Sequence, residues 1–436
     1  MKLFNTLFSI IISIRAAIAS SIADASTQNI GLKTCVVNPG GNSSIDDAPA
    51  IIDAFNQCGL DGKILFLNET YHVNTVLNTT GLKNCEVDLR GTLLLLLKWG
   101  NNITYWLNNS LPVGYQNQIL QSSAWVFGGD NINFQGHGYG TLNGCGQAWY
   151  TFIHGQSNYP GRPHAITIAN TTNSVFEGIR FVQSQMWTMT VIHSKNVLLQ
   201  DIYVNNAGND GTTSSNTDGA NTIFSDNITF ERWDITNGDD SIAFKANSTN
   251  IHVLDSTFHN GLGIAFGSIG QYKGEFNTIE NIRVKNITCY NTLHGAYVKT
   301  WTGQQVGYPP NGGGGGLGFM KDILLSDFTL NNLSGIPFSI SQCTTFSGAA
   351  GACNTSLFEI EDLTFKNVAG TIGTNPIASL QCSAAAPCKN ITLQNIDLAL
   401  RNGTAASGYN CDAVVGSVGF NCTGSTCGTS SATGSC

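Results

Sequence analysis

The sequence predicts an all-β solenoid, in which the chain winds into coils and each coil stacks on the one before it. Short phrases recur in which a polar turn runs into alternating apolar residues, and their starts in the centre of the chain are roughly 22 to 31 residues apart. Glycine contributes 49 of the 436 residues and charged residues only 11%, which is typical of a chain with many turns. A solenoid suits such a repeat because each coil buries its inward side chains only against its neighbours. A large β-sandwich with irregular hairpins is the alternative.

The strand phrases follow one another through most of the chain. They occupy residues 131–134, 173–181, 196–204, 227–235, 250–258, 278–287, 322–330, 358–365 and 390–398. No linker-like break separates them, so we expect residues 20–410 to form one domain.

The N-terminal stretch before these phrases has a different pattern. Residues 45–58 carry helical spacing and acidic residues in the first turn, which predicts a helix that covers the open end of the first coil. Such a cap protects apolar side chains and an exposed sheet edge. The Cys-, Gly- and Ser-rich residues 411–436 are expected to close the other end.

The first nineteen residues read as a signal peptide. Lys2 precedes an apolar run, and an A-x-A site ends at Ala19. The run is too short to span a membrane, and no later stretch of eighteen apolar residues appears. We therefore expect cleavage after Ala19 and a secreted, soluble protein. Frequent N-x-S/T sequons predict glycosylation.

Thirteen cysteines in a secreted chain predict disulfides, with one thiol left over. Cys343 with Cys353, and Cys382 with Cys388, are close enough in sequence to close short loops, whereas the other pairings stay open. Metal binding is the less favoured use because no C-x-x-C pair is present.

The net charge of −8 argues against nucleic acid and anionic membranes as partners. An acidic sugar would have to be bound by a few local cations. A capped solenoid needs no second subunit, so we expect a monomer.

A stretch of the chain between residues 216 and 270 carries the candidate chemistry. Asp218 and Asp239 are 21 residues apart, and Leu262 follows Asp239 by 23, which predicts a column on adjacent coils. Asp239 and Asp240 can share a cleft only where the strand ends or bulges. Crowded carboxylates repel, so one of them keeps a proton near working pH, as a pair of general acid and base requires.

Ordinary structural roles stand beside these interpretations. Aspartate in N-x-D-G and G-D-D also forms turns. Lys299 is alternatively a solvated lysine at a strand end, and Tyr297, two residues away, serves either sugar stacking or packing. The same choice applies to Trp187 and Trp301, and His294 is alternatively a loop histidine.

Several motifs in order resemble the polygalacturonase family, glycoside hydrolase family 28. They are N-T-D-G at residues 216–219, G-D-D at 238–240 and G-x-G-I-x-x-G-S at 261–268. Upstream, G-H-G-Y-G-T-L-N-G at 136–144, the W-Y pair that follows it and the R-P pair at 162–163 fit the same family. The resemblance covers most of residues 30–410.

The resemblance implies a right-handed parallel β-helix that hydrolyses α-linked sugars of pectin with inversion and without metal or other cofactors. By the same resemblance Asp239 is the proton donor, Asp218 and Asp240 activate water, and Asn216 orients them. An inverting enzyme typically separates its acid and base by roughly 6.5 to 9.5 Å, which leaves room for the water.

Two positions depart from the family pattern. Leu262 stands where the family has a histidine, and His294 is the candidate to replace that histidine in space. Tyr297 stands where the family has an arginine that binds a galacturonate carboxylate. Lys299 remains, but a lysine lacks the planar two-pronged grip of arginine. We therefore predict Asn216, Tyr297 and Lys299 as substrate-binding residues and an exo-acting α-L-rhamnosidase on rhamnogalacturonan, in which Lys299 holds the galacturonate beyond the cut. The long loop between Trp301 and Met320 is consistent with exo attack.

Three other functions stay open. An exopolygalacturonase that releases galacturonate is the nearest alternative. A pectate lyase would share the coil but use bound calcium and a basic residue. A non-catalytic carbohydrate-binding solenoid would keep the coils and lose the chemistry.

Overall fold

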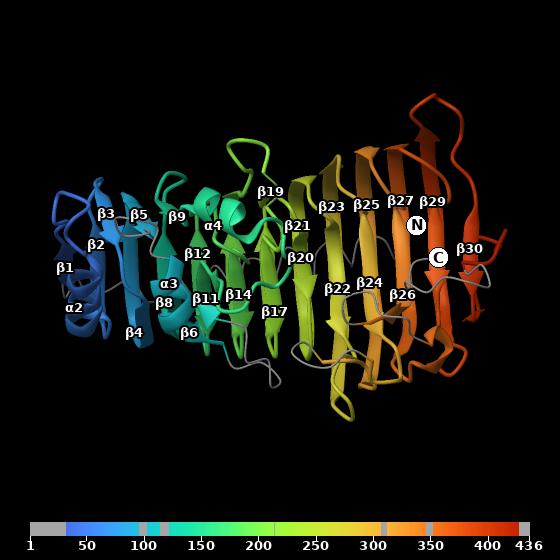
Figure 1. Cartoon of the computed structure of the whole chain (residues 1–436), viewed down its shortest axis with the longest axis horizontal. Helices are drawn as coiled ribbons and strands as arrows, with labels where there is room; N and C mark the ends of the chain where they lie inside the picture. The colour runs from blue at the N-terminus through green and yellow to red at the C-terminus, as the bar shows by residue number, and fades with distance from the viewer. Residues whose placement is uncertain are drawn as a thin grey trace, which may run out of the picture.

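The computed structural model describes residues 32–95, 103–113, 122–212, 214–306, 312–345 and 352–426, and β-strands dominate them. In these residues a 28-stranded sheet forms by parallel pairing of strands on successive coils. Figure 1 shows the coils following one another along a single axis from the N-terminal to the C-terminal end. The solenoid prediction is confirmed, and the β-sandwich, which is built from antiparallel strands, is excluded.

The strands before the central coils are β1 (Lys33–Val37), β2 (Gly62–Phe66), β3 (Thr70–Val73), β4 (Leu77–Leu89), β5 (Thr92–Leu95), β8 (Trp125–Gln135), β9 (Thr141–Asn143), β11 (Ile166–Ala169), β12 (Thr172–Glu177) and β13 (Arg180–Val182). The later strands are β14 (Met189–Ile192), β15 (Lys195–Gln200), β16 (Tyr203–Asn205), β17 (Ala220–Ile223), β18 (Asp226–Glu231), β19 (Asp234–Asn237), β20 (Asp240–Phe244), β21 (Ser248–Asn260), β22 (Gly263–Ile269), β23 (Phe276–Tyr290), β24 (Ala296–Trp301), β25 (Leu317–Leu333), β26 (Phe338–Thr344), β27 (Glu359–Ile372), β28 (Ala378–Gln381), β29 (Cys388–Leu400), β30 (Tyr409–Asp412) and β31 (Val414–Val415). Short strands β6 (Leu111–Pro112), β7 (Ser122–Ser123) and β10 (Pro163–His164) form a separate small sheet.

Apolar side chains stack in columns inside the coils. Phe176 of β12 pairs with Leu199 of β15, and that residue pairs with Phe230 of β18, which pairs with Val253 of β21. All four are at most 1% exposed. The alternation seen in the sequence phrases therefore reflects one inward and one outward face for each strand.

Asparagines occupy the corner at the start of many coils. Asn173, Asn196 and Asn227 have φ of 50°, 56° and 55°, a left-handed conformation that asparagine tolerates better than most residues. Asn196 Nδ2 donates to Asn173 Oδ1 at 2.9 Å, and Asn227 Nδ2 donates to Asn196 Oδ1 at 2.8 Å. This ladder explains why the phrases begin with asparagine.

Helix α2 (Ala48–Cys58) covers the N-terminal end of the solenoid, as predicted (Figure 1). It buries Ile51 and Phe55 among the first coils. The helix begins three residues later than we expected, and its first turn lacks acidic residues. Asp46 and Asp47 precede it instead: Ala48 N–H donates to Asp46 Oδ1 at 3.1 Å, whereas Asp47 accepts from the backbone of two other segments.

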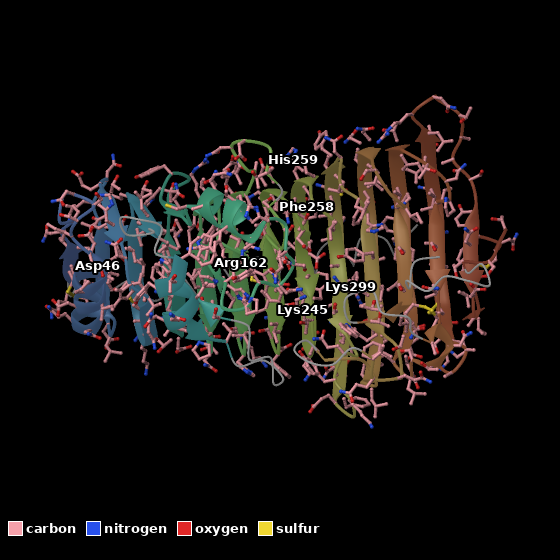
Figure 2. All side chains as sticks on the ribbon, viewed as in Figure 1. Asp46, Arg162, Lys245, Phe258, His259 and Lys299 are labelled. Carbon is pink, nitrogen blue, oxygen red and sulfur yellow. A yellow bond between two sulfur atoms is a disulfide. The ribbon has the colours of Figure 1, made fainter. Side chains whose placement is uncertain are left out.

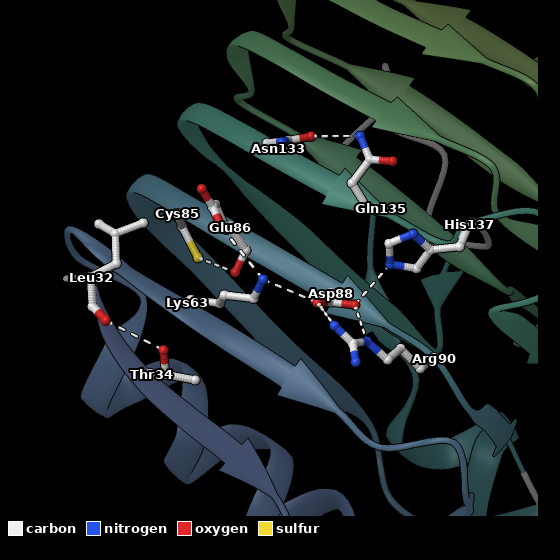
Figure 3. A network of polar contacts seen from close by, with 10 residues as sticks. All are labelled: Leu32, Thr34, Lys63, Cys85, Glu86, Asp88, Arg90, Asn133, Gln135 and His137. Atoms are coloured by element: carbon white, nitrogen blue, oxygen red, sulfur yellow. Dashed lines mark hydrogen bonds and ion pairs between the residues drawn. The ribbon is translucent and has the colours of Figure 1, made fainter. Parts of the chain in front are cut away.

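A polar network joins the first coils on the outer surface (Figure 3). Asp88 of β4 accepts from Arg90 at 2.9 and 2.8 Å, and it also contacts Lys63 Nζ at 3.0 Å and His137 Nε2 at 2.8 Å. Burial raises the pKa of Asp88, but these three partners outweigh it and hold the pKa well below its usual range. The network links β2, β4 and the turn before β9.

The predicted pairs Cys343–Cys353 and Cys382–Cys388 are confirmed, and two further disulfides join Cys35 to Cys58 and Cys411 to Cys422. The expectation of one leftover thiol was wrong. Within the described residues three thiols are free, those of Cys85, Cys145 and Cys289. Two of them are buried, as is usual for cysteine packed as a small apolar residue.

Some predictions fall on residues whose placement is not described. The signal peptide, residues 1–19, lies outside the described residues, as do the last ten residues of the Cys-rich tail. The loop after Trp301 is described only in part, and it ends sooner than we expected, because β25 begins at Leu317, which pairs with Phe276 of β23. Among the described residues, helices are all too short or too polar to cross a membrane. Two short helices complete the description, α3 (Ile103–Asn109) and α4 (Gly146–Ile153).

Candidate active site

Three aspartates from two neighbouring coils converge on the outer face of the middle of the solenoid. Asp218 lies just before β17, and Asp239 and Asp240 lie at the start of β20. Each offers a carboxylate oxygen within 4.8 Å of those of the other two. The pairing of β20 with β22 shifts register after Asp240. The expected distortion, which lets two consecutive aspartates share one side, is therefore present.

The alignment of the aspartates on adjacent coils differs by one residue from our prediction, which paired Asp218 with Asp239. Ala220 pairs with Ile242, so the backbone aligns Asp218 with Asp240 rather than with Asp239. The N–H of Gly219 accordingly donates to the carbonyl of Asp240 at 3.0 Å. Asp239 lies just before the first residue of β20 and is half-buried.

Asn216 holds the carboxylate of Asp239. Its backbone N–H donates to Oδ2 at 3.1 Å and its side-chain Nδ2 donates to the same oxygen at 3.3 Å. The N–H of Asp240 donates to Asp239 Oδ1 at 2.9 Å. Asn216 in turn accepts from the N–H of Asn158 at 2.7 Å, which fixes its amide. These direct hydrogen bonds to Asp239 support the predicted orienting role of Asn216.

The pKa values of Asp239 and Asp218 are both raised, which favours their protonated forms. Burial, followed by repulsion from Asp240, raises the pKa of Asp239 to about 6. Burial, followed by repulsion from Asp239 and Asp240, raises the pKa of Asp218 well above its usual range. Asp218 is only 2% exposed, and its Oδ1 has no hydrogen-bond partner among the described residues. The carboxyl of Asp239, which can donate a proton, therefore lies beside Oδ1 of Asp218, which is free to accept a hydrogen bond.

Tyr297, which replaces the family arginine, is bound to the aspartates. Its hydroxyl donates to Asp240 Oδ1. Its ring packs on Ala243 and Ala265, with Leu262 at the edge of this small apolar cluster. Burial raises the pKa of Tyr297 well above its usual range, so the hydroxyl keeps its proton. Tyr297 is 9% exposed, and this contact favours a positioning role over a free stacking surface.

His294 lies on the coil next to Leu262, and its backbone N–H donates to the carbonyl of Leu262 at 3.2 Å. Its Nδ1–H donates to the carbonyl of Ile336 at 2.6 Å, and its ring packs against Tyr297 with centroids 4.9 Å apart. Burial lowers the pKa of His294. Trp187 and Trp301 are each only 6% exposed, so both are largely packed.

Three cations surround the three carboxylates. Figure 2 labels Arg162, Lys245 and Lys299 on the middle coils. Burial lowers the pKa of Lys299, but the three aspartates outweigh it and raise that pKa above its usual value. Burial lowers the pKa of Lys245, and the aspartates only partly offset it. Arg162 is fully buried and interacts electrostatically with Asp239 and Asp218.

The sequence analysis did not assign roles to Lys245 and Arg162. Lys245 comes directly after an apolar strand and is five residues beyond Asp240. The position of this charged residue at the end of a buried strand was the feature of the sequence that indicated a role for Lys245. Arg162 was noted only as part of the R-P pair, and its proximity to the aspartates depends on long-range packing.

The three carboxylates lie close together because two of the aspartates are consecutive and the third lies on the adjacent coil, about 4.8 Å away. The same spacing is compatible with a cation site of oxygen ligands. However, Lys245, Lys299 and Arg162 interact electrostatically with these aspartates, and a divalent cation would add positive charge to a site that already holds three cations, so the residues do not fit a resident metal ion.

Comparison with known proteins gives one consistent assignment. The sequence profile described as Glycosyl hydrolases family 28 matches residues 78–422. A protein from Aspergillus niger named "Alpha-L-rhamnosidase rgxB" is 55% identical over 95% of this chain and 96% of its own length. A "Putative galacturan 1,4-alpha-galacturonidase A" from Aspergillus flavus is 36% identical over 87% of this chain and 91% of its own length.

Solved structures share the fold. The endo-xylogalacturonan hydrolase from Aspergillus tubingensis superposes with a TM-score of 0.76 at 24% identity, over 91% of this chain and all of that one. The polygalacturonase from Erwinia carotovora gives a TM-score of 0.61 at 17% identity, over 89% of this chain and 99% of that one. With the profile match and the sequence relatives, the chain belongs to glycoside hydrolase family 28 and is a glycosidase.

Proposed function

We propose that this chain is a secreted, exo-acting α-L-rhamnosidase that removes terminal rhamnose from rhamnogalacturonan. The observation that carries this proposal is the 55% identity, over almost the whole of both chains, to a protein named as an α-L-rhamnosidase. The site supports it, because Tyr297 stands in the place of the family arginine and its hydroxyl is hydrogen-bonded to Asp240. A terminal rhamnose has no carboxylate, so its site needs no arginine.

Each aspartate has a role in this proposal. Asp239, held by Asn216 and with its pKa raised to about 6, gives its proton to the glycosidic oxygen as the bond from that oxygen to the rhamnose anomeric carbon breaks. Asp218 and Asp240 hold a water molecule and take its proton as it attacks that carbon from the opposite side. Tyr297 orients Asp240 by its hydroxyl.

The extracellular location rests on several features together. Four disulfides lie within the described residues, and disulfides persist in oxidising compartments. The first nineteen residues carry the features of a signal peptide. A pectic polysaccharide outside the cell is then the substrate, and a monomer suffices because all three aspartates belong to one chain.

An exopolygalacturonase is the second candidate. It is favoured by the 36% identity to a protein named as a galacturonidase and by the two lysines beside the aspartates. A lyase that uses calcium is less favoured, because Lys245 and Lys299 already place positive charge near the carboxylates that would bind the ion.

Product analysis separates these functions. The purified protein and its Asp239→Asn variant are incubated with rhamnogalacturonan oligomers, polygalacturonate and a synthetic α-L-rhamnoside, and the products are identified by chromatography. Rhamnose released only by the unmodified protein, with or without a chelator, supports the proposal. Galacturonate released from polygalacturonate would instead favour the exopolygalacturonase. Unsaturated products that disappear with a chelator would reveal a lyase, and no product at all would favour a binding protein.

A further inference from the structure

Lys245 and Lys299 lie on the same outward row of the solenoid, with a single glycine between them. Gly267 pairs with Lys299 in the register of β22 and β24. On the other side, Lys245 Nζ donates to the carbonyl of Gly267 at 3.1 Å. Adjacent strands are about 4.8 Å apart, so the two lysine backbones lie roughly 10 Å apart. Two side chains of this length can converge on one small group above the glycine.

Gly267 lets the strands on either side of it approach closely. It has φ of +112°, a conformation that side chains rarely adopt, and a Cβ there would lie 2.3 Å from the carbonyl oxygen of Lys299. Any other residue would therefore strain the backbone and clash with the strand that carries Lys299.

Both ammonium groups keep unused donors. Lys245 is only 6% exposed, and its Nζ makes a single hydrogen bond, while the Trp187 ring lies 4.7 Å from it. Among the described residues, neither lysine lies within 4.0 Å of a carboxylate oxygen. An ammonium has three donors, and a buried cation without a direct counter-ion is costly unless a ligand supplies one.

The charges around the site point to the same kind of ligand. Asp218, Asp239 and Asp240 are matched in number by Lys245, Lys299 and Arg162. Because Asp239 carries a proton in the proposed reaction, the three cations outnumber the ionised carboxylates. A substrate that brings one carboxylate would reduce this excess of positive charge.

We propose that Lys245 and Lys299 together bind the carboxylate of the galacturonate that leaves when the terminal rhamnose is cut off. This inference rests on the proposed function, and it adds Lys245 as a residue that determines substrate specificity. Two point charges across Gly267 then replace the two-pronged grip that one arginine would supply. The acidic leaving sugar is recognised while the rhamnose side needs no cation.

The test compares a substrate that has this carboxylate with one that lacks it. Lys245→Met removes the charge and keeps the length and apolar stem of the side chain. We expect the ratio of kcat/KM for a rhamnosyl-galacturonate oligomer to kcat/KM for an aryl α-L-rhamnoside to fall about 10- to 100-fold, mainly through KM. Lys299→Met is expected to lower the same ratio, and Lys245→Arg to recover part of it.

An equal loss on both substrates would overturn the proposal, because it would mean that Lys245 acts on the catalytic carboxylates. An unchanged ratio in a variant with an unaltered unfolding midpoint would overturn it as well. Failure of the proposed function is recognised separately, because the unmodified protein would then release no rhamnose from either substrate. In that case calorimetric binding of digalacturonate to the Asp239→Asn protein, with and without Lys245→Met, decides the lysine site: equal affinities would refute it.

Discussion

Replacing Asp239 by asparagine should make the folded protein more stable at neutral pH and less stable in acid. The pKa of Asp239 rises from 3.8 to about 6 on folding. Below the lower value the carboxyl is neutral in both states. As the pH rises toward the upper value, the unfolded chain loses its proton first, so the folded state loses stability. Once the pH exceeds both pKa values, this difference between them lowers the free energy of unfolding by about 3 kcal/mol.

Asparagine avoids this loss because it is neutral at every pH. It cannot accept from all of the donors that Asp239 meets, namely the N–H and Nδ2 of Asn216 and the N–H of Asp240. One or two lost hydrogen bonds cost about 1 kcal/mol each. The variant should therefore be about 1 to 2 kcal/mol more stable than the unmodified protein at pH 7, and about 1 kcal/mol less stable at pH 4.

The assay is urea unfolding of both proteins at several pH values between about 4 and 7.5, with the difference in free energy plotted against pH. Asp397→Asn, at an exposed aspartate of β29, is the matched control for the same change of side chain. If the difference for Asp239→Asn varied with pH no more than that for Asp397→Asn, the reasoning would be refuted, because the carboxyl of Asp239 would then not hold its proton more tightly in the folded state.

Three further predictions concern other parts of the structure. Tyr297→Phe removes the hydroxyl that donates to Asp240, so kcat should fall about 10- to 100-fold with KM within about threefold, and a larger change in KM than in kcat would contradict a positioning role. Gly267→Ala should lower the melting temperature and raise KM for acidic oligomers, since its Cβ would lie 2.3 Å from the carbonyl oxygen of Lys299; a variant as stable and as active as the parent would disprove this close approach. Replacing Cys411 and Cys422 by serine opens a link between residues 11 apart and should cost about 3 kcal/mol. Hydrogen exchange should then accelerate in β30 while β20 stays protected, and uniform acceleration would instead indicate that the coils unfold as one unit.

Much of the fold follows from local patterns. Alternating apolar residues predicted the strands, and polar residues predicted the turns between them, where the structure has many asparagines in a left-handed conformation. The amphipathic pattern near the N-terminus predicted α2, although its start depends on how Asp46 and Asp47 bind neighbouring segments. Such contacts are made between distant parts of the chain and leave no local signature.

The site was predictable only in part. The spacing of Asp218, Asp239 and Asp240 indicated a shared cleft, but β17 pairs with β20 so that Asp218 aligns with Asp240, one residue beyond the aspartate that residue counting selected. Coil lengths vary, so residue counting cannot place outward rows across several coils. For this reason the sequence did not predict that Lys245 lies near Lys299, or that the Tyr297 hydroxyl reaches Asp240.

The most direct test of the account is the configuration of the sugar that is released first. Proton NMR during hydrolysis of an aryl α-L-rhamnoside distinguishes the two anomers before they interconvert. Water held by Asp218 and Asp240 predicts β-L-rhamnose as the first product. Initial α-L-rhamnose would contradict the account, because it would mean that one aspartate attacks the sugar directly.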